Sequence, residues 1–390
     1  MFKKVKLSDL GDIYTGNTPS KNNKDFYNSN DIMFIKPDTL SYNIKNIENS
    51  NEYISEKARE KARIIPKNSL LVSCIGNIGK LGINNEPVAF NQQINAIVHN
   101  NKIESSKYLA YVLKFNQKKL QSIANAPVVP IINKNDFSKF EVYIHDDLNI
   151  QKRIVDILDK AMVLIQKRQE EIKYLDDLIK SKFIEMFGDP ISNSKKWDSI
   201  RLSAIGEWKT GGTPLRSNLD YFKGNIPWLS SGELNNKYCF DSNEHITEDA
   251  IKNSSAKLIE KESLLLGMYD TAALKSTINM IECTCNQAIA YSKLNNNIVN
   301  TIYVYYCIQE GKQFYKNKQR GVRQKNLNLT MIKDLEIIMP PIELQNKFAD
   351  FVKETDKLKF EMEKSLEELE NNFNSLMQRA FNGELFNEKQ

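Results

Sequence analysis

Two stretches of forty residues contain neither glycine nor proline, and they constrain the fold more than any other feature of the chain. The first covers residues 148–187 and the second covers residues 342–381. Because nothing in either stretch interrupts a helix, each is predicted to form one continuous helix, roughly 60 Å long at about 1.5 Å per residue. A helix of that length extends beyond a small domain, so most of its apolar surface needs a partner from elsewhere.

Apolar residues recur every seven positions in both stretches, which is typical of helices that pack along a seam. In the first stretch a second row, formed by Ile157, Leu164 and Leu178, is predicted to lie beside the main row. We expect the two helices to be partners of each other. The residues assigned to the helix pair and its partner contacts are Leu158, Ile165, Ile172, Ile179, Met362, Leu366, Leu369, Phe373 and Leu376.

The two helices belong to a repeat that covers nearly the whole chain. KLSDLGDIYTGNTP, at residues 6–19, matches RLSAIGEWKTGGTP, at residues 201–214, with an offset of 195, and the helices follow with an offset of 194. Unrelated stretches do not hold a register for so long, so the pattern indicates a duplication. The predicted order is a domain at 1–147, a helix at 148–187, a domain at 188–341, a helix at 342–381 and a tail at 382–390.

Each domain reads as mixed α and β structure, which predicts an α+β fold. Short β-rich runs alternate with clusters of Asn, Gly, Ser and Pro, and one longer helical pattern occurs in each domain. The expected strands are 70–75, 96–99, 141–144 and 335–339, and the expected domain helices are 107–120 and 301–316.

Enzyme motifs are missing from the sequence. It contains no G-x-x-x-x-G-K-[ST], G-x-G-x-x-G, G-x-S-x-G or H-E-x-x-H pattern, and residues 76–80, Gly-Asn-Ile-Gly-Lys, lack the Ser or Thr of a phosphate loop. The five cysteines are expected to be free thiols without structural zinc, because Cys283-Thr-Cys285 has no paired ligand spacing. We therefore expect a chain with no catalytic residues, metal or cofactor. No apolar run is long enough for a membrane span, and no signal peptide is recognisable, which favours a cytoplasmic location.

Positive charge is concentrated in the two domains. The formal net charge is +5 for residues 1–147 and +3 for residues 188–341, whereas the second helix carries −3. Residues 311–333 and 107–134 contain no acidic residue. An isolated basic run is most simply a solvated surface, but its recurrence in both halves favours binding to a polyanion.

The basic segments also contain Arg, Gln and Asn, whose side chains can hydrogen-bond to base edges as well as to phosphates. The loops after the Thr-Gly-x-Thr-Pro motif differ between the halves, as expected if each half reads a different short DNA sequence. Drift of unconstrained loops is the alternative explanation. The residues predicted to bind DNA are Thr18, Ser20, Lys21, Asn77, Lys80, Gln92, Lys118, Lys119, Thr213, Arg216, Tyr269, Thr271, Lys275, Gln287, Arg320, Arg323, Gln324, Lys325 and Asn326.

The order and duplication of these motifs resemble the specificity subunit of type I restriction-modification systems over essentially the full chain. The likeness is carried by residues 6–19, their repeat at 201–214, residues 321–327, Gln151 and Gln345 at the helix starts, and residues 187–190, Phe-Gly-Asp-Pro. It implies two target-recognition domains joined by an antiparallel coiled coil, with an internal pseudo-two-fold repeat. Each domain would read one half of a bipartite double-stranded DNA target, and the helices would set the gap between the halves.

The same resemblance implies partners that perform the chemistry. Two methyltransferase subunits would dock on the chain, joined in complexes that also cleave DNA by two restriction–translocase subunits. S-adenosylmethionine, ATP and Mg would then bind only to those partners. In the first half, residues 126–130 replace the polar stretch 321–325, so the base contacts of that half are expected to differ.

A second function remains open from the sequence alone. The chain could be a coiled-coil interaction scaffold whose basic domains bind protein or RNA. A neighbouring gene for an adenine methyltransferase would favour DNA recognition over this alternative.

Overall fold

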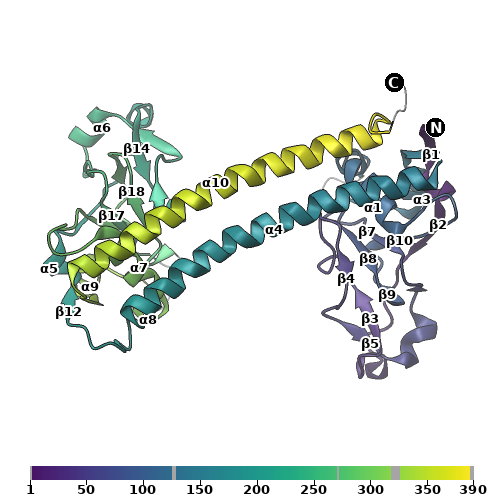
Figure 1. The fold of residues 1–390 in the computed structure, drawn as a ribbon, viewed down its shortest axis with the longest axis horizontal. Helices are drawn as coiled ribbons and strands as arrows, with labels where there is room; N and C mark the ends of the chain where they lie inside the picture. Colours follow the sequence, from purple (N-terminus) through teal and green to yellow (C-terminus); the bar gives the residue numbers. More distant parts are fainter. Residues whose placement is uncertain (1, 125–128, 270–271, 318–325, 387–390) are drawn as a thin grey trace. The chain divides into compact units, whose positions relative to one another are not determined.

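The computed structural model describes residues 2–124, 129–269, 272–317 and 326–386 (Figure 1). The chain divides into two compact units. Unit 1 combines Met1–Gln169 with Lys364–Gln390, and unit 2 consists of Glu170–Glu363. Each long helix therefore contributes about one half to each unit. The boundaries of the two compact units lie within the helices and not between domain and helix along the sequence.

The described residues of the unit 1 domain form three sheets. A five-stranded sheet has the order β2-β10-β7-β8-β4, a four-stranded sheet has the order β5-β3-β9-β6, and β1 pairs with β11. Three short 3-10 helices connect the strands: Leu7–Asp9, Lys24–Tyr27 and Glu56–Lys61. The strands are β1 Phe2–Lys6, β2 Gly11–Thr15, β3 Ile32–Ile35, β4 Asn46–Ile47, β5 Tyr53–Ile54, β6 Ile64–Ile65, β7 Leu70–Ser73, β8 Leu81–Asn84, β9 Val88–Phe90, β10 Ile94–His99 and β11 Glu141–His145.

The domain of unit 2 repeats this topology. Its sheets have the orders β13-β20-β17-β18-β15, β16-β14-β19 and β12-β21. Each is the counterpart of a sheet in unit 1, except that the sheet around β14 has three strands where the sheet around β3 has four. The predicted α+β fold and internal repeat are thus confirmed. The strands are β12 Ser199–Arg201, β13 Lys209–Thr210, β14 Ile226–Leu229, β15 Tyr238–Cys239, β16 Glu244–Ile246, β17 Leu264–Gly267, β18 Ser276–Asn279, β19 Thr284–Cys285, β20 Ile289–Ser292 and β21 Glu336–Ile338.

The two long helices have the predicted bounds, α4 at Leu148–Phe187 and α10 at Ile342–Phe381. The first ends at Gly188, whose φ of +78° is a conformation that only glycine adopts without strain. Each predicted domain helix, by contrast, is two short helices, interrupted at Asn116 and Gly311. The short helices are α1 Ser106–Phe115, α2 Gln117–Ser122, α3 Lys134–Lys139, α5 Leu202–Ile205, α6 Glu248–Lys252, α7 Thr301–Glu310, α8 Lys312–Lys316 and α9 Leu329–Lys333, with 3-10 turns at Leu219–Phe222 and Ser231–Glu233.

The long helices pair in an antiparallel sense within each unit. In unit 1 the first half of α4, including Leu158 and Ile165, shares a core with Phe373 near the end of α10. In unit 2 the second half of α4, including Ile179, shares a core with Phe348 near the start of α10. All nine residues assigned to the helix pair are buried or half-buried.

The second apolar row predicted on α4 is wrong in part. Leu164 and Leu178 are 54% and 48% exposed, whereas Leu175, which was not predicted, is buried. A single partner helix covers only a narrow seam, so residues one position off that seam stay in solvent.

A buried glutamine ties the first turn of each long helix to its domain. The Gln151 side-chain amide donates to the carbonyl oxygens of Lys102 and His145, and its oxygen accepts from Glu104 N at 2.8 Å. In unit 2, Gln345 donates to Pro340 O at 2.8 Å and accepts from Asn300 N at 3.0 Å. Both glutamines are fully buried, so these bonds satisfy backbone groups that water does not reach.

Candidate nucleic-acid interface

The sheet topology brings the predicted loops of unit 1 together at one edge. Strand β10 is antiparallel to both β2 and β7, so it begins where the other two end. Backbone hydrogen bonds then join the segments, from Gly16 N to Ile94 O at 3.2 Å, from Cys74 N to Gln93 O at 2.8 Å and from Gly76 N to Pro130 O at 2.9 Å. We call this place, formed by residues 16–24, 74–80, 91–93 and 129–132, the loop edge of unit 1.

Unit 2 has an equivalent loop edge, formed by residues 211–219, 268–269, 285–288 and 326–327. Gly211 N donates to Ile289 O at 3.1 Å, and Leu327 N donates to Met268 O at 2.8 Å. Tyr269 and Asn326 form an isolated β-bridge. Segments 78 residues apart in sequence are therefore hydrogen-bonded to each other in both units, Gly16 to Ile94 and Gly211 to Ile289.

A threonine and a glutamine from the shared motifs are hydrogen-bonded in each unit. Thr18 Oγ1 donates to Gln92 Oε1 at 2.7 Å, and Thr213 Oγ1 donates to Gln287 Oε1. Both glutamines are exposed, and 74 residues separate the partners in each pair. Because the amide oxygen accepts from the threonine, the amide N–H groups remain available as donors at the surface.

Helix α2 supports residues 76–80 of the unit 1 loop edge. Gln117 and Gln121 donate to the carbonyl oxygens of Gly79 and Ile78 at 3.2 and 3.1 Å. Asn77 is exposed, and the Lys80 ammonium lies 5.7 Å from the centre of the Tyr42 ring. The loop is thus held by its backbone while Asn77 faces solvent.

Of the other residues predicted to bind DNA in unit 1, two are on the loop edge and two are not. Ser20 and Lys21 are exposed there. Lys118 and Lys119 lie on α2, where Lys119 Nζ donates to Glu141 O at 3.1 Å and sits 5.4 Å from the Phe140 ring centre. Lys119 therefore has intramolecular partners at Phe140 and Glu141, where strand β11 begins.

Arg216 of unit 2 is held by other protein groups. Its two terminal nitrogens donate to both carboxylate oxygens of Glu244 at 2.6 and 2.8 Å, and its guanidinium lies 4.5 and 4.6 Å from the ring centres of Phe222 and Trp228. The hydrogen bond from Arg216 lowers the pKa of Glu244, so this carboxylate stays charged. A bidentate, stacked arginine fixes the loop that carries it.

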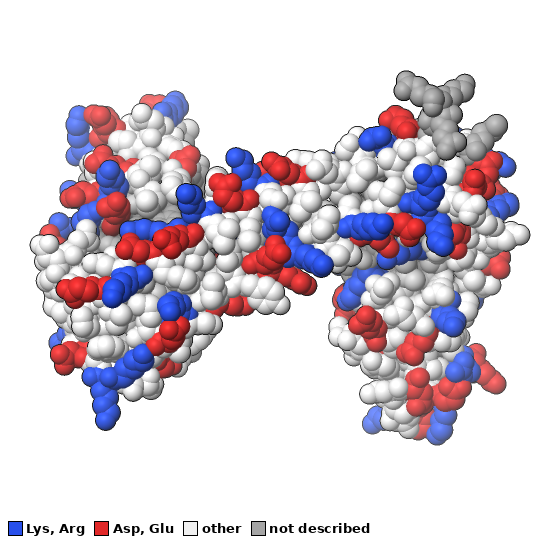
Figure 2. All heavy atoms as spheres, viewed as in Figure 1, with Lys and Arg blue, Asp and Glu red and all other residues white. Residues whose placement is uncertain are grey.

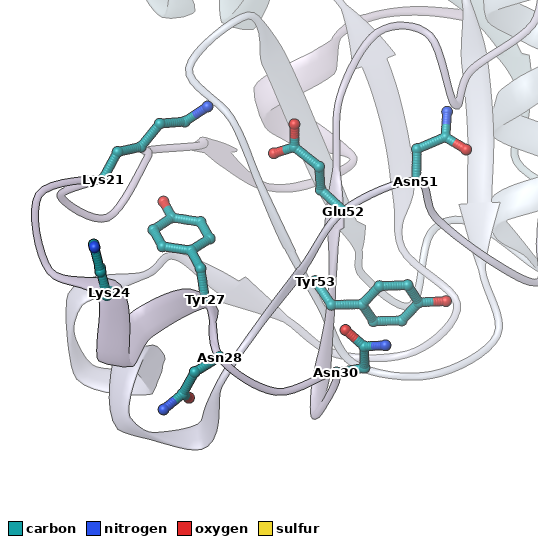
Figure 3. A pocket seen from close by; sticks show the side chains of 8 residues that line it. All are labelled: Lys21, Lys24, Tyr27, Asn28, Asn30, Asn51, Glu52 and Tyr53. Carbon is teal, nitrogen blue, oxygen red and sulfur yellow. The ribbon is translucent and has the colours of Figure 1, made fainter.

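The corresponding place in unit 1 is an open recess of about 740 Å³ (Figure 3). Lys21 matches Arg216 in sequence, and the strand registers place Glu52 where unit 2 has Glu244. However, Glu52 pairs with Lys36. The described residues that line the recess include no arginine; they are Lys21, Lys24, Tyr27, Asn28, Asn30, Asn51, Glu52 and Tyr53.

Lys275 lies next to the loop edge of unit 2, since its carbonyl oxygen accepts from Gly267 N at 2.8 Å. Its ammonium donates to Asn235 Oδ1 at 2.8 Å. Burial lowers the pKa of nearby Lys312, as do the charges of Lys316 and Lys275, so several cations gather here. Five residues predicted to bind DNA lie outside the described residues: Thr271, Arg320, Arg323, Gln324 and Lys325.

Surface charge alone does not mark the interface. In the view of Figure 2, acidic and basic side chains are interspersed on both domains and on the helices. Sequence reasoning missed Glu244 and the two aromatic rings, which determine what Arg216 can contact. The signal for the threonine–glutamine pairs was present, since the same spacing of 74 residues occurs in both halves.

The described residues contain no group of three or more His, Cys, Asp or Glu arranged to hold a metal ion. The five cysteines are free, and burial raises the pKa of the Cys74, Cys283 and Cys307 thiols to about 12. None of the helices in the described part of the chain is long and apolar enough to cross a membrane.

Comparison with known proteins gives a consistent result. The sequence model of the type I restriction modification DNA specificity domain matches residues 1–174 and again residues 194–371. The MjaIX specificity subunit of Methanocaldococcus jannaschii is 24% identical over 371 residues, which is 89% of this chain and 85% of that protein. The HindI specificity subunit of Haemophilus influenzae is 34% identical over 178 residues, 43% of this chain and 38% of that protein.

Solved structures share the fold. The S subunit of a type I restriction-modification system from M. genitalium superposes with a TM-score of 0.57 at 15% identity, covering 98% of this chain and 96% of that one. A chain from a structure on complex assembly and conformational transition of the type I R-M system gives a TM-score of 0.66 at 13% identity, covering 98% of both chains.

Proposed function

The chain belongs to the family of type I restriction-modification DNA specificity proteins, and from this premise we propose that its two loop edges each read one half of a bipartite DNA target. One observation carries the proposal. The two edges share a backbone arrangement and the threonine–glutamine pair, yet they expose different side chains, Ser20, Lys21 and Lys24 against Leu215, Arg216 and Leu219. Equivalent surfaces with different side chains suit two different short sequences.

The long helices would set the gap between the half-sites. Each helix belongs to both units, so its length limits how far apart the two loop edges can be. Forty residues rise about 60 Å, which equals less than about 18 base pairs. The helices would act as a spacer without taking part in the choice of bases.

The chemistry would reside in partner subunits. We propose that two methyltransferase subunits bind equivalent surfaces created by the internal repeat, with restriction–translocase subunits added in complexes that cleave. S-adenosylmethionine, ATP and Mg would bind to those partners, and the complex would act in the cytoplasm. Family membership favours this function over a scaffold that binds protein or RNA.

Methylation mapping tests the proposal directly. A host genome is sequenced for modified adenine with and without this gene, with the methyltransferase partner present in both. The expected result is one bipartite motif that depends on the gene. The proposal would be contradicted if the genome without the gene kept every methylated motif, or if the purified chain alone transferred methyl groups to DNA.

The spacer role has its own test. Seven residues are inserted in α4 after Gln169 and seven in α10 after Glu363, where the two compact units meet in sequence. A heptad preserves the packing seam and adds about 10 Å, so the preferred gap should grow by up to about three base pairs. Both half-sites should stay unchanged, and a change of recognised bases at a constant gap would exclude the spacer role.

A further inference from the structure

Two leucines at the loop edge of unit 2 are unusually exposed. Leu215 is 67% exposed and Leu219 is 71% exposed, more than any other large apolar side chain among the described residues. They follow Thr213, whose hydroxyl bonds to Gln287. Since apolar surface gains free energy when it leaves water, an apolar pair beside a predicted reading site indicates a surface that a ligand covers.

The backbone that carries these leucines is fixed. Asn218 N donates to Leu215 O at 3.0 Å, and Asp220 N donates to Asn218 Oδ1 at 3.2 Å. Arg216 holds the same turn against strands β14 and β16, through its two hydrogen bonds to Glu244 and the stacking of its guanidinium on the Trp228 ring. A ligand would therefore meet a preorganised pair of side chains and lose little affinity to ordering of the loop.

Unit 1 builds the same turn with other side chains. Asn23 N donates to Ser20 O at 3.2 Å, and Asp25 N donates to Asn23 Oδ1 at 3.1 Å. The positions of the two leucines are taken by Ser20 and Lys24. The same backbone thus presents a hydroxyl and an ammonium in one unit and two isobutyl groups in the other.

This difference identifies the kind of ligand. Two identical protein subunits that bind a duplicated chain need similar residues on both halves. The two positions have opposite character, so the ligand differs between the halves, as the two half-sites of a bipartite DNA target do. The only apolar group on a base edge in the major groove is the 5-methyl group of thymine.

We propose that Leu215 and Leu219 read thymine by contact with its 5-methyl group in the half-site bound by unit 2. This inference rests on the proposed function. The side chains of Ser20 and Lys24 end in a hydroxyl and an ammonium group, so unit 1 reads its half-site at these positions through polar contacts.

The test measures binding of the chain, assembled with its methyltransferase partner, to duplexes that carry the mapped target. Thymines of the second half-site are replaced one at a time by uracil, which removes only the methyl group. Removing a methyl group that the protein contacts should weaken binding about fourfold, as expected from the free energy of burying one methylene-sized group. The double variant L215S/L219K, which installs the residues of unit 1, should bind the thymine duplex more weakly and be indifferent to uracil.

Two controls separate this effect from general damage. Leu258→Ser changes another exposed leucine of unit 2 outside the loop and should keep the thymine preference. Replacing thymines of the first half-site by uracil should have the same effect on binding by the wild type and by every variant. Both leucines are exposed, so L215S/L219K should unfold at the wild-type temperature.

Three outcomes overturn the inference. The wild type could be insensitive to uracil at every position, the double variant could keep the thymine preference, or it could lose the methyltransferase partner while its base preference stays intact. Failure of the proposed function looks different, because the wild-type complex would then not distinguish the target from a scrambled duplex.

Discussion

The two units share their backbone almost element by element but attach to the long helices differently. In unit 1, Tyr111 on α1 donates to Asp159 on α4 at 2.7 Å, and Lys107 pairs with the same carboxylate at 2.7 Å. In unit 2, Lys237, which directly precedes β15, pairs with Asp356 on α10 at 2.6 Å. The duplicated chain has thus kept the fold while exchanging the polar contacts between domain and helix.

The attachment in unit 2 is the more buried of the two. The side chains of Lys237 and Asp356 are 16% and 22% exposed, against 37% and 30% for Lys107 and Asp159. Tyr238 and Tyr306 complete the site, since Tyr238 donates to Asp356 at 3.1 Å and Lys237 donates to the Tyr306 hydroxyl at 3.0 Å. A buried ion pair costs much when one partner is removed, whereas an exposed one costs little.

The largest effect should come from removing one partner of the buried ion pair in unit 2. Asp356→Asn leaves the Lys237 ammonium buried without its counter-charge, and we expect unit 2 to lose about 3 kcal/mol of stability. Asp159→Asn should cost unit 1 only about 1 kcal/mol. Tryptophan fluorescence during denaturation reports unit 2 alone, because Trp197, Trp208 and Trp228 all belong to it. Circular dichroism reports both units. Equal losses in the two variants would mean that the attachments are equivalent.

The buried glutamines provide the opposite case, in which the two units should behave alike. Gln151→Met and Gln345→Met keep the side-chain volume but leave a backbone N–H and at least one carbonyl without a partner. Each should destabilise its own unit by about 1–3 kcal/mol. The fluorescence midpoint should move only for Gln345→Met. If one variant were neutral, the corresponding helix start would be held by packing instead.

Much of this arrangement follows from the sequence, and the physical reason is local. The long helices were predicted residue by residue because no Gly or Pro occurs between Leu148 and Phe187, and Gly188 ends the first of them. The repeat was readable because its motifs set backbone turns. The pairing of Arg216 with Glu244 was not, since it depends on how β14 and β16 are aligned, which no local pattern encodes.

Solvent pH should also separate the two units. His145 at the end of β11 is buried, and burial lowers its pKa, although a hydrogen bond to the backbone of Ala380 raises it in part. The folded state therefore binds its proton less readily than the unfolded state. Stability of unit 1 should be full above about pH 6.5, the ordinary value for histidine, and should fall as the pH drops from there toward the lowered pKa.

The counterpart of His145 in unit 2 is Pro340, whose carbonyl accepts from Gln345 as that of His145 accepts from Gln151. His145→Gln should therefore remove part of the decline of unit 1 between pH 7 and pH 5. Circular dichroism midpoints across this range measure the effect. An unchanged slope in the variant would assign the decline to other groups.

The smallest effect on stability is expected where the predicted second row of α4 proved to be exposed. Leu164→Gln and Leu178→Gln replace side chains that are about half exposed, so each should change stability by less than about 0.5 kcal/mol. Leu158→Gln should be strongly destabilising, because Leu158 is fully buried. One substitution lies in each unit, so the pair samples both halves of the repeat. If this row is part of the surface for the proposed methyltransferase partners, both variants should bind the partner more weakly while stability is kept. Sedimentation of the mixed subunits measures this, and full assembly with both variants would restrict docking to other faces of the helices.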